Sequence, residues 1–455
     1  MTPDVLRTLL AWVEVLRPAL TRPGYANALV VFAGWVLSTG KRAVTEALVA
    51  TDVARQRHHE RFHRFFSRGT WSPDNIGRLL FERIGAWAGE GALHVALDDT
   101  LTPKKGAHVF GIGSHLDAVR STKRFRVFTF GHVWVVLSVV VRVPFSRRPW
   151  AIPVLFRLYR NKKECKRKGG RYRKKTELGR ELVDLIATWA GDRRVHATMD
   201  SAYCNATLMR GLPSTVEVFG AIRPDAVLTA LPTPRRAGDR GRPPVRGRLL
   251  PKPEQLAKNA QQPWRTCRAE LYGQRRKIEY KTVDAQWYRG CGSRLVRIVI
   301  VRVVDGTIGL RVFLCTDRAR SVVTILETYA ERWAIEVAFR DLKQHLGFAD
   351  SSARKQAAVE RTAPFVGFIY TILVLWFAEG ARNADVATPP IRPWYPHKRG
   401  ASFADILRAA QRTLAGVDIL DPACGLANLH KSAAAAAPAP NRRRRAEQPA
   451  LRRAA

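Results

Sequence analysis

The stretch "YAERWAIEVAFRDLKQHLG", residues 329–347, has the spacing of a helix that carries a polar stripe along one side. At about 100° per residue, four polar side chains project within about 60° of one another: those of Tyr329, Arg332, Glu336 and Lys343. Glu336 follows Arg332 by four residues, so an ordinary ion pair on a helix surface would also explain this spacing. The alternative is a functional surface, in which the carboxylate holds a metal ion and the cations bind phosphate groups.

The same stretch also has an apolar face, which predicts how the helix packs. Large apolar side chains recur at helical spacing next to the polar stripe: Ile335, Phe339, Leu342 and Leu346. A helix with this pattern packs its apolar face against a sheet, and the bordering polar stripe then lies at the mouth of a crevice. The stripe would therefore form part of a functional site if polar side chains from other segments lie at the same crevice.

Two aspartates follow short apolar segments that are predicted to be strands. The segment "ALHVAL" (92–97) precedes Asp98, and "RRVHATM" (193–199) precedes Asp200. We expect both carboxylates at strand ends, where α/β sheets open onto ligand-binding crevices. Taken singly, each aspartate could be a turn or cap residue. Together with Glu336 they could hold two Mg²⁺ or Mn²⁺ ions, because hard cations favour carboxylate oxygens and two ions can clamp an in-line displacement at phosphorus.

The charge of the chain points to a polyanionic partner. Its 455 residues include 77 Lys and Arg against 38 Asp and Glu, which gives a net charge of +39. Lys and Arg gain affinity for nucleic acid by releasing the counterions condensed on its phosphates. An anionic membrane surface is the alternative partner, and a GC-rich coding sequence would explain the preference for Arg over Lys but not the excess of bases over acids. We therefore expect the chain to bind nucleic acid.

The cysteines and the apolar segments bear on where the chain works. The six cysteines form no C-x-x-C pair, which disfavours zinc and a disulfide framework and suits the reducing cytoplasm. The N-terminus lacks the basic region of a signal peptide. The most apolar stretch, residues 365–380, is too short to span a bilayer comfortably and is predicted to be a buried helix. We expect a cytoplasmic protein without a membrane partner.

Composition and periodicity predict an α/β fold. We expect two strands within 125–143, separated at Gly131, and a helix over 73–88 that begins with the Ser72–Pro73 pair. Five segments are predicted: a mostly helical region over 1–90, a segment with short strands over 91–230, a strand-rich segment over 231–312, a segment over 313–385 that contains the quoted helix, and a C-terminal region with a basic disordered tail over 386–455.

These residues resemble the bacterial insertion-sequence transposases of the DDE superfamily. The pattern Y-x2-R-x3-E-x6-K looks like the YREK signature of that group, and "DDT" and "DSAY" resemble the segments that carry its two aspartates. The resemblance extends over about residues 55–375 and places the acids on Asp98, Asp200 and Glu336, although Asp99 leaves the first position uncertain by one residue. It implies an RNase H-like core, a mixed sheet flanked by helices, formed by residues 91–230 and 313–385. The β-rich insertion over 231–312 would lie between the second aspartate and the glutamate, and the helical region over 1–90 would bind DNA.

The resemblance also implies an activity and a set of contacts with DNA. Such enzymes cleave DNA at the ends of an insertion sequence and join the freed 3′-OH to target DNA, using Mg²⁺ or Mn²⁺ held by the three acids. Double-stranded DNA at the element ends and the target is the expected partner, and a homodimer is expected in the synaptic complex. Contacts with DNA are expected from these residues: Tyr329, Arg332, Lys343, the Lys104 and Lys105 of "TPKKG", and Trp264 and Trp287.

Several alternatives stay open at this point. Trp264 and Trp287 are candidates for stacking on a flipped base, although a tryptophan in such a segment is more often part of the core. The basic run "NKKECKRKGGRYRKK" (161–175) is either a loop that contacts DNA or a solvated loop. The whole chain could instead be a catalytically silent DNA-binding regulator derived from a transposase, or a nuclease on the same fold that does not transfer strands. The expected location is the bacterial cytoplasm, in association with the nucleoid.

Overall fold

A computed structural model describes most of the chain. The described residues are 3–106, 108–122, 124–234, 241–303, 309–382, 393–398 and 400–420. The predicted basic tail, including "NRRRR", lies outside them. Met1–Ala415 forms one compact unit, and Gly416–Ala455 forms a second. The predicted division into five segments stays a prediction, and the following description concerns the first unit.

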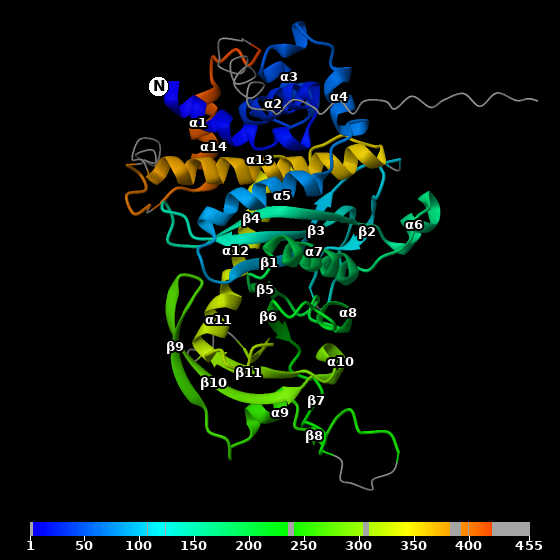
Figure 1. Ribbon diagram of the computed structural model, residues 1–455, viewed down its shortest axis with the longest axis vertical. Helices are drawn as coiled ribbons and strands as arrows, with labels where there is room; N and C mark the ends of the chain where they lie inside the picture. The colour runs from blue at the N-terminus through cyan, green and yellow to red at the C-terminus, as the bar shows by residue number, and fades with distance from the viewer. Residues whose placement is uncertain are drawn as a thin grey trace, which may run out of the picture. The chain divides into compact units, whose positions relative to one another are not determined.

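The centre of this unit is a mixed sheet with an RNase H-like arrangement (Figure 1). Its core strands are β1 (Leu93–Pro103), β3 (Phe128–Val141), β4 (Trp150–Tyr159), β5 (Val195–Met199) and β6 (Val216–Ile222). They lie in the order β4-β3-β1-β5-β6. β3 is antiparallel to β1 and β4, whereas β1, β5 and β6 are parallel to one another. The predicted fold class, an α/β mixed sheet flanked by helices, is therefore confirmed.

The β-rich segment after β6 continues the same sheet rather than forming a separate one. Its strands are β7 (Leu228–Thr229), β8 (Leu249–Leu250), β9 (Arg265–Leu271), β10 (Gln274–Gln286), β11 (Leu295–Val303) and β12 (Arg311–Cys315). β12 pairs antiparallel with β6, and β11, β10 and β9 follow in antiparallel order. Apolar side chains of β6, β10 and β11, among them Phe219, Ile278 and Val299, are buried in one cluster with Ile325.

The structure corrects the prediction of two strands within 125–143. β3 is one strand from Phe128 to Val141, and Gly131 lies inside it. A Cβ atom on Gly131 would approach the carbonyl oxygen of Thr102 in β1 to 2.2 Å. Glycine therefore lets two strands approach closely at this point, and local sequence could not distinguish that requirement from a strand break.

Helices on opposite faces of the sheet position the candidate acids. α7 (Lys175–Ala190) packs on the face to which Leu97 points, and Gly179 allows its close approach to that side chain. α11 (Val322–Glu331) and α12 (Trp333–His345) return along the other face, where α12 packs against β1 and β4. The single helix predicted over 329–347 is wrong in one respect, because a tightened turn at Arg332 separates α11 from α12.

Helices also make up the N-terminal region and return near the C-terminus. They are α1 (Pro3–Glu14), α2 (Arg22–Leu37), α3 (Val44–Ala50), α4 (Glu60–Ser67), α5 (Pro73–Ile84), α13 (Gln356–Arg382) and α14 (Phe403–Leu414). Ser72 caps α5 as predicted, accepting a hydrogen bond from the Asp74 amide. α13 contacts β4, α4, α5, α1 and α14 (Figure 1). Within the described chain, α13 alone is long and apolar enough to cross a membrane, yet 89% of its apolar window is buried in the protein. The prediction of a buried helix over 365–380 is confirmed.

Candidate catalytic site

Asp98 lies inside β1, at the point where the pairing with β5 ends. The last parallel pair joins Leu97 to Met199, and β1 then continues beside β3 as far as Pro103. The expectation that Asp98 ends a strand is therefore wrong, although it does end the parallel ladder. Asp200 follows β5 directly, so the two aspartates leave the β1–β5 ladder next to each other.

Arg332 joins Asp98 to the glutamate of the helix. Its Nη1 atom lies 2.6 Å from Oδ2 of Asp98, and its Nη2 atom lies 2.8 Å from Oε1 of Glu336. The side chains of Arg332 and Asp98 are only 12% and 17% exposed. The tightened turn between α11 and α12 directs Arg332 at the sheet while the neighbouring Trp333 stays exposed. Two acids that are 238 residues apart in the chain thus share one guanidinium group.

The carboxyl group of Asp98 is electrostatically unusual. Burial raises its pKa from 3.8 to about 7; Arg332 opposes this shift, and the nearby Asp200 adds to it. Asp200 uses Oδ1 to accept hydrogen bonds from the amides of Ala202 and Tyr203, at 2.9 and 3.2 Å, which stabilises the turn after β5. The raised pKa of Asp98 thus reflects its burial first, and Arg332 offsets only part of that shift.

The structure places Asp99 on the opposite face of the sheet. Its Oδ1 atom lies 2.7 Å from Nζ of Lys175 on α7, and its Oδ2 atom accepts a hydrogen bond of 2.9 Å from the Tyr203 hydroxyl. Adjacent residues of a strand point to opposite faces, so only Asp98 can reach Arg332 and Glu336. Sequence left a choice between the two aspartates, and the register of the sheet assigns Asp98 to the side of the helix.

The donor set suits a divalent cation, but the acids do not form a ready metal site. In the part of the chain that the structure describes, no three or more His, Cys, Asp or Glu side chains are grouped so that they could hold a metal ion. Asp98 and Glu336 instead share Arg332, whose positive charge stands between them. Carboxylate oxygens are the ligands that Mg²⁺ prefers, and a cation would offset the burial and the nearby Asp200 that raise the pKa of Asp98. A metal ion would have to replace Arg332 between the acids.

The other residues of the polar stripe differ in their surroundings. The Tyr329 ring packs against Phe313 at 4.7 Å, and the Arg332 guanidinium lies 5.7 Å from its centre. Burial raises the pKa of Tyr329 to about 12, so its hydroxyl stays protonated. Lys343 is exposed near the other end of α12. Tyr329 is therefore placed to support Arg332, whereas Lys343 is accessible to a ligand.

The two lysines of "TPKKG" also differ in their surroundings. Lys104 donates a hydrogen bond to the carbonyl oxygen of Ser351, and burial lowers its pKa to about 8. Lys105 is exposed. Of these two lysines, Lys105 can contact DNA without rearrangement of its surroundings, whereas Lys104 cannot.

The two tryptophans named as candidates for base stacking are both partly buried in the β-rich segment. The Trp264 ring is covered by Nζ of Lys281 at 4.8 Å and by the guanidinium of Arg302 at 4.4 Å. Trp287 precedes the short helix α10 (Tyr288–Cys291) and packs over Gly290. Cations over an aromatic ring stabilise the packing of that ring, so the contacts of Lys281 and Arg302 support a structural role for Trp264. The predicted contact of either ring with a DNA base stays a prediction.

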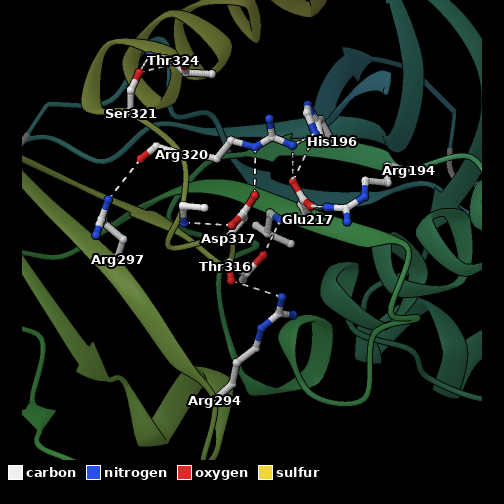
Figure 2. A network of polar contacts seen from close by, with 12 residues as sticks. Arg194, His196, Glu217, Arg294, Arg297, Thr316, Asp317, Arg320, Ser321 and Thr324 are labelled. Atoms are coloured by element: carbon white, nitrogen blue, oxygen red, sulfur yellow. Dashed lines mark hydrogen bonds and ion pairs between the residues drawn. The ribbon is translucent and has the colours of Figure 1, made fainter. Parts of the chain in front are cut away.

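Sequence reasoning missed a polar network that holds α11 to the sheet (Figure 2). Glu217 is buried on β6 and accepts hydrogen bonds from Arg194 at 2.5 Å and from Arg320 at 3.1 Å. His196 lies 3.1 Å from Glu217, and burial lowers the pKa of His196 to about 4, so the imidazole is neutral. Arg320 also pairs with Asp317 at 3.0 Å, just before α11 begins. The network therefore anchors the segment that leads into the helix of Glu336.

A cavity of about 560 Å³ adjoins this network, lined by Arg194, Glu217, Arg294 and Asp317 among others. It opens where β5 and β6 begin, whereas Asp200 lies where β5 ends. One feature of the sequence could have indicated this network: His94 and His196 each lie four residues before one of the aspartates, Asp98 and Asp200. Their rings lie 4.9 Å apart, and His94 contacts Glu331 at the end of α11. These residues support the site and do not belong to it.

The raised pKa of Asp98 predicts a pH-dependent stability difference. Between pH 4 and 7 the carboxyl group is protonated in the folded chain and ionised in the unfolded chain, so it destabilises the fold as pH rises. Asp98→Asn removes this effect. The measured quantity is the unfolding free energy of the variant minus that of the natural chain, both in EDTA. This difference should be about 2 kcal/mol larger at pH 8 than at pH 5. Chemical denaturation at both pH values measures it, and a constant difference would contradict the electrostatic assignment.

Comparison with known proteins identifies the family once this geometry is established. A structure titled "Cryo-EM structure of piggyBac transposase synaptic complex with hairpin DNA (SNHP)" matches with a TM-score of 0.41 and 10% identity, covering 96% of this chain and 84% of that chain. A likeness at this level carries no conclusion about this chain. No curated protein matches the chain. The family model for DDE superfamily endonuclease matches residues 15–290, a range that contains Asp98 and Asp200 and ends before Glu336. Since that range is more than half of the 455 residues, the chain belongs to the DDE superfamily endonucleases.

Proposed function

We propose that the chain is a DNA transposase of a bacterial insertion sequence, which cleaves DNA at the element ends and transfers the freed strands into target DNA. The observation that supports this proposal best is the sharing of Arg332 by Asp98 and Glu336, with Asp200 beside them, on an RNase H-like sheet. The order of these acids in the chain and the Tyr-Arg-Glu-Lys stripe agree with the YREK group of transposases.

The three acids have the role of metal ligands in this proposal. Endonucleases of the DDE superfamily generally use divalent metal ions, and two Mg²⁺ or Mn²⁺ ions would stabilise the charge on the attacking and leaving oxygens. Asp98, Asp200 and Glu336 would hold them. Arg332 contacts two of these acids, Asp98 and Glu336, in the protein alone, and it would then be released to pair with a DNA phosphate. Asp99 would keep the β1 backbone in place through Lys175 and Tyr203.

The charge distribution supports DNA as the partner. The net charge of +39 favours long-range attraction to a duplex. Lys343 and Lys105 are exposed and available for phosphate contacts. Bringing two element ends together requires at least two copies, so a homodimer is proposed for the synaptic complex. The proposed location is the bacterial cytoplasm, in association with the nucleoid and without a membrane partner.

The decisive experiment is a cleavage and strand-transfer assay. The substrate is DNA that carries the sequences flanking the coding region, incubated with the full chain with and without Mg²⁺. We expect cleavage and joined products only with Mg²⁺, and neither with Asp200→Ala. Unchanged products from the variant would contradict the proposal.

The same assay separates two alternative functions. Mg²⁺-dependent cleavage without joined products would identify a nuclease that does not transfer strands. Binding of the flanking DNA in a gel shift, without cleavage by the natural chain, would identify a catalytically silent regulator. Intact Asp98, Asp200 and Glu336 favour the enzyme over the regulator, because a regulator needs none of these acids.

A further inference from the structure

A hairpin next to the candidate site exposes an unusual amount of apolar surface. β2 (Gly113–Leu116) pairs with the start of β3, and the loop between them ends at Val127. Five large apolar side chains of this hairpin are exposed: Leu116, Val119, Phe125, Phe128 and Phe130. In the part of the chain that the structure describes, all exposed phenylalanines lie on this hairpin. Three exposed rings on one hairpin are unfavourable in water unless a ligand covers them.

The hairpin is an ordered frame rather than a loose loop. Asp117 donates its backbone amide to Val127 at 2.9 Å, and its carboxylate accepts hydrogen bonds from the Val119 and Arg120 amides and the Thr129 hydroxyl. Thr122 and Phe125 close the tip with a further backbone hydrogen bond of 2.8 Å. These bonds hold the apolar side chains in place before any ligand arrives, which lowers the entropic cost of binding.

The exposed rings share a face with the candidate catalytic acids. Val136 is the direct partner of Asp98, and every second residue of β3 points to the same side. Phe130 and Phe128 therefore lie on the face of Asp98, and Leu116 joins them as the partner of Phe128. Six residues separate Phe130 from Val136, about 20 Å along the strand. At about 3.4 Å per nucleotide this is about six nucleotides of a DNA strand.

Lys343 lies between the hairpin and the acids. It is seven residues beyond Glu336 on α12, which is about 10 Å along the helix axis. Partial desolvation by neighbouring groups lowers the pKa of Lys343, and the nearby carboxylate of Asp117 opposes this shift, which places Asp117 close to the lysine. Lys343 therefore lies on the hairpin side of Glu336 on α12.

The charges around the rings decide between possible occupants. Arg120, Arg124 and Arg126 are exposed on the same loop. A second copy of the chain in a two-fold contact would bring two such sets of arginines together, which is unfavourable, whereas DNA phosphates would neutralise them. Exposed aromatic rings among arginines provide stacking surfaces for bases and contacts for the backbone.

We propose that the β2–β3 hairpin binds DNA about six nucleotides from the cleaved phosphate, and that its phenylalanines stack on bases unstacked from the duplex. This inference rests on the proposed function for its substrate, and it adds a binding site for distorted DNA. The hairpin supplies two kinds of contact. Arg120, Arg124 and Arg126 bind phosphates, while Phe125, Phe128 and Phe130 select DNA whose bases are already unpaired or easily unstacked.

The test compares two DNA probes with the full chain in EDTA, so that it needs no cleavage. One probe is a 30-base-pair duplex, and the other carries a three-nucleotide mismatch at its centre. The natural chain should bind the mismatched probe about tenfold more tightly. The triple variant Phe125→Ser, Phe128→Thr and Phe130→Thr should bind both probes equally. Leu249→Thr, which removes an exposed apolar side chain of β8, should keep the preference.

A second variant tests the arginines independently. Replacing Arg120, Arg124 and Arg126 by Gln should reduce the slope of log affinity against log salt concentration by about 2 to 3 on the paired duplex. All six side chains are exposed, so the melting temperatures should stay within about 2 °C of the natural chain. An unchanged salt slope would overturn the assignment of the arginines to phosphate.

Two results would overturn the hairpin proposal as a whole. One is an undiminished mismatch preference in the phenylalanine variant. The other is a loss of self-association in light scattering with unchanged DNA binding, which would identify a second copy of the chain as the occupant. If mismatch binding depends on the hairpin but no Mg²⁺-dependent cleavage is found, only the proposed function fails. If cleavage is intact and the preference does not depend on the hairpin, only this inference fails.

Discussion

Asp98→Asn should reduce Mg²⁺-dependent DNA cleavage at least about a hundredfold, while DNA binding in a gel shift changes less than about threefold. The substitution keeps the shape of the side chain but removes the negative charge that a divalent ion needs. Asp98 is the only one of the two adjacent aspartates that reaches Arg332. Single-turnover cleavage of end-labelled DNA measures the effect directly.

Asp99→Asn is the matched control, because it makes the same chemical change one residue away. Asp99 pairs with Lys175 and Tyr203 on the other face of the sheet. The variant should lose about 1 kcal/mol of unfolding free energy and retain cleavage within about fivefold. If Asp99→Asn abolished cleavage and Asp98→Asn did not, the assignment of the first acid would be reversed.

Arg332→Gln should separate metal binding from catalysis. Arg332 competes with a cation for Asp98 and Glu336, so its removal should tighten Mn²⁺ binding to the protein alone about tenfold. Cleavage should nevertheless fall at least about a hundredfold, because the guanidinium is also needed for a DNA phosphate. Titration with Mn²⁺ monitored by electron paramagnetic resonance gives the affinity, and the cleavage assay gives the rate.

Arg78→Gln provides the control for this substitution. Arg78 pairs with Glu82 four residues later on α5, as Arg332 does with Glu336, but both side chains of the α5 pair are more than half exposed. Its removal should change neither the Mn²⁺ affinity nor the cleavage rate by more than about twofold. Weaker Mn²⁺ binding in Arg332→Gln would mean that the arginine organises the acids rather than competing with the ion.

Glu336→Gln completes the comparison of the acids proposed to hold metal. We expect no cleavage, largely intact binding of the element end, and an undisturbed fold, since Glu336 is only partly buried. A parallel loss of DNA binding in a gel shift would show that the glutamate supports the DNA surface rather than the chemistry.

Much of the fold could be predicted because its signals are local. Short apolar segments indicated β5 and the first part of β1, the Ser72–Pro73 pair indicated the start of α5, and helical spacing indicated the buried face of α12. The prediction failed at Gly131 and at Arg332, where the backbone conformation depends on a neighbour from another segment. Gly131 is required by the closeness of Thr102, and the turn at Arg332 directs its side chain to an aspartate.

The same distinction holds for the candidate site. The acids and the polar stripe were visible in the residues themselves, since the chemistry of carboxylates and cations does not depend on the fold. Only the tertiary structure decided that Asp98 rather than Asp99 faces α12, that Lys104 is partly buried against Ser351, and that the phenylalanines of the hairpin share the face of the acids. Strand register and burial arise from contacts between distant segments, such as the 234 residues that separate Asp98 from Arg332, and no local pattern records them.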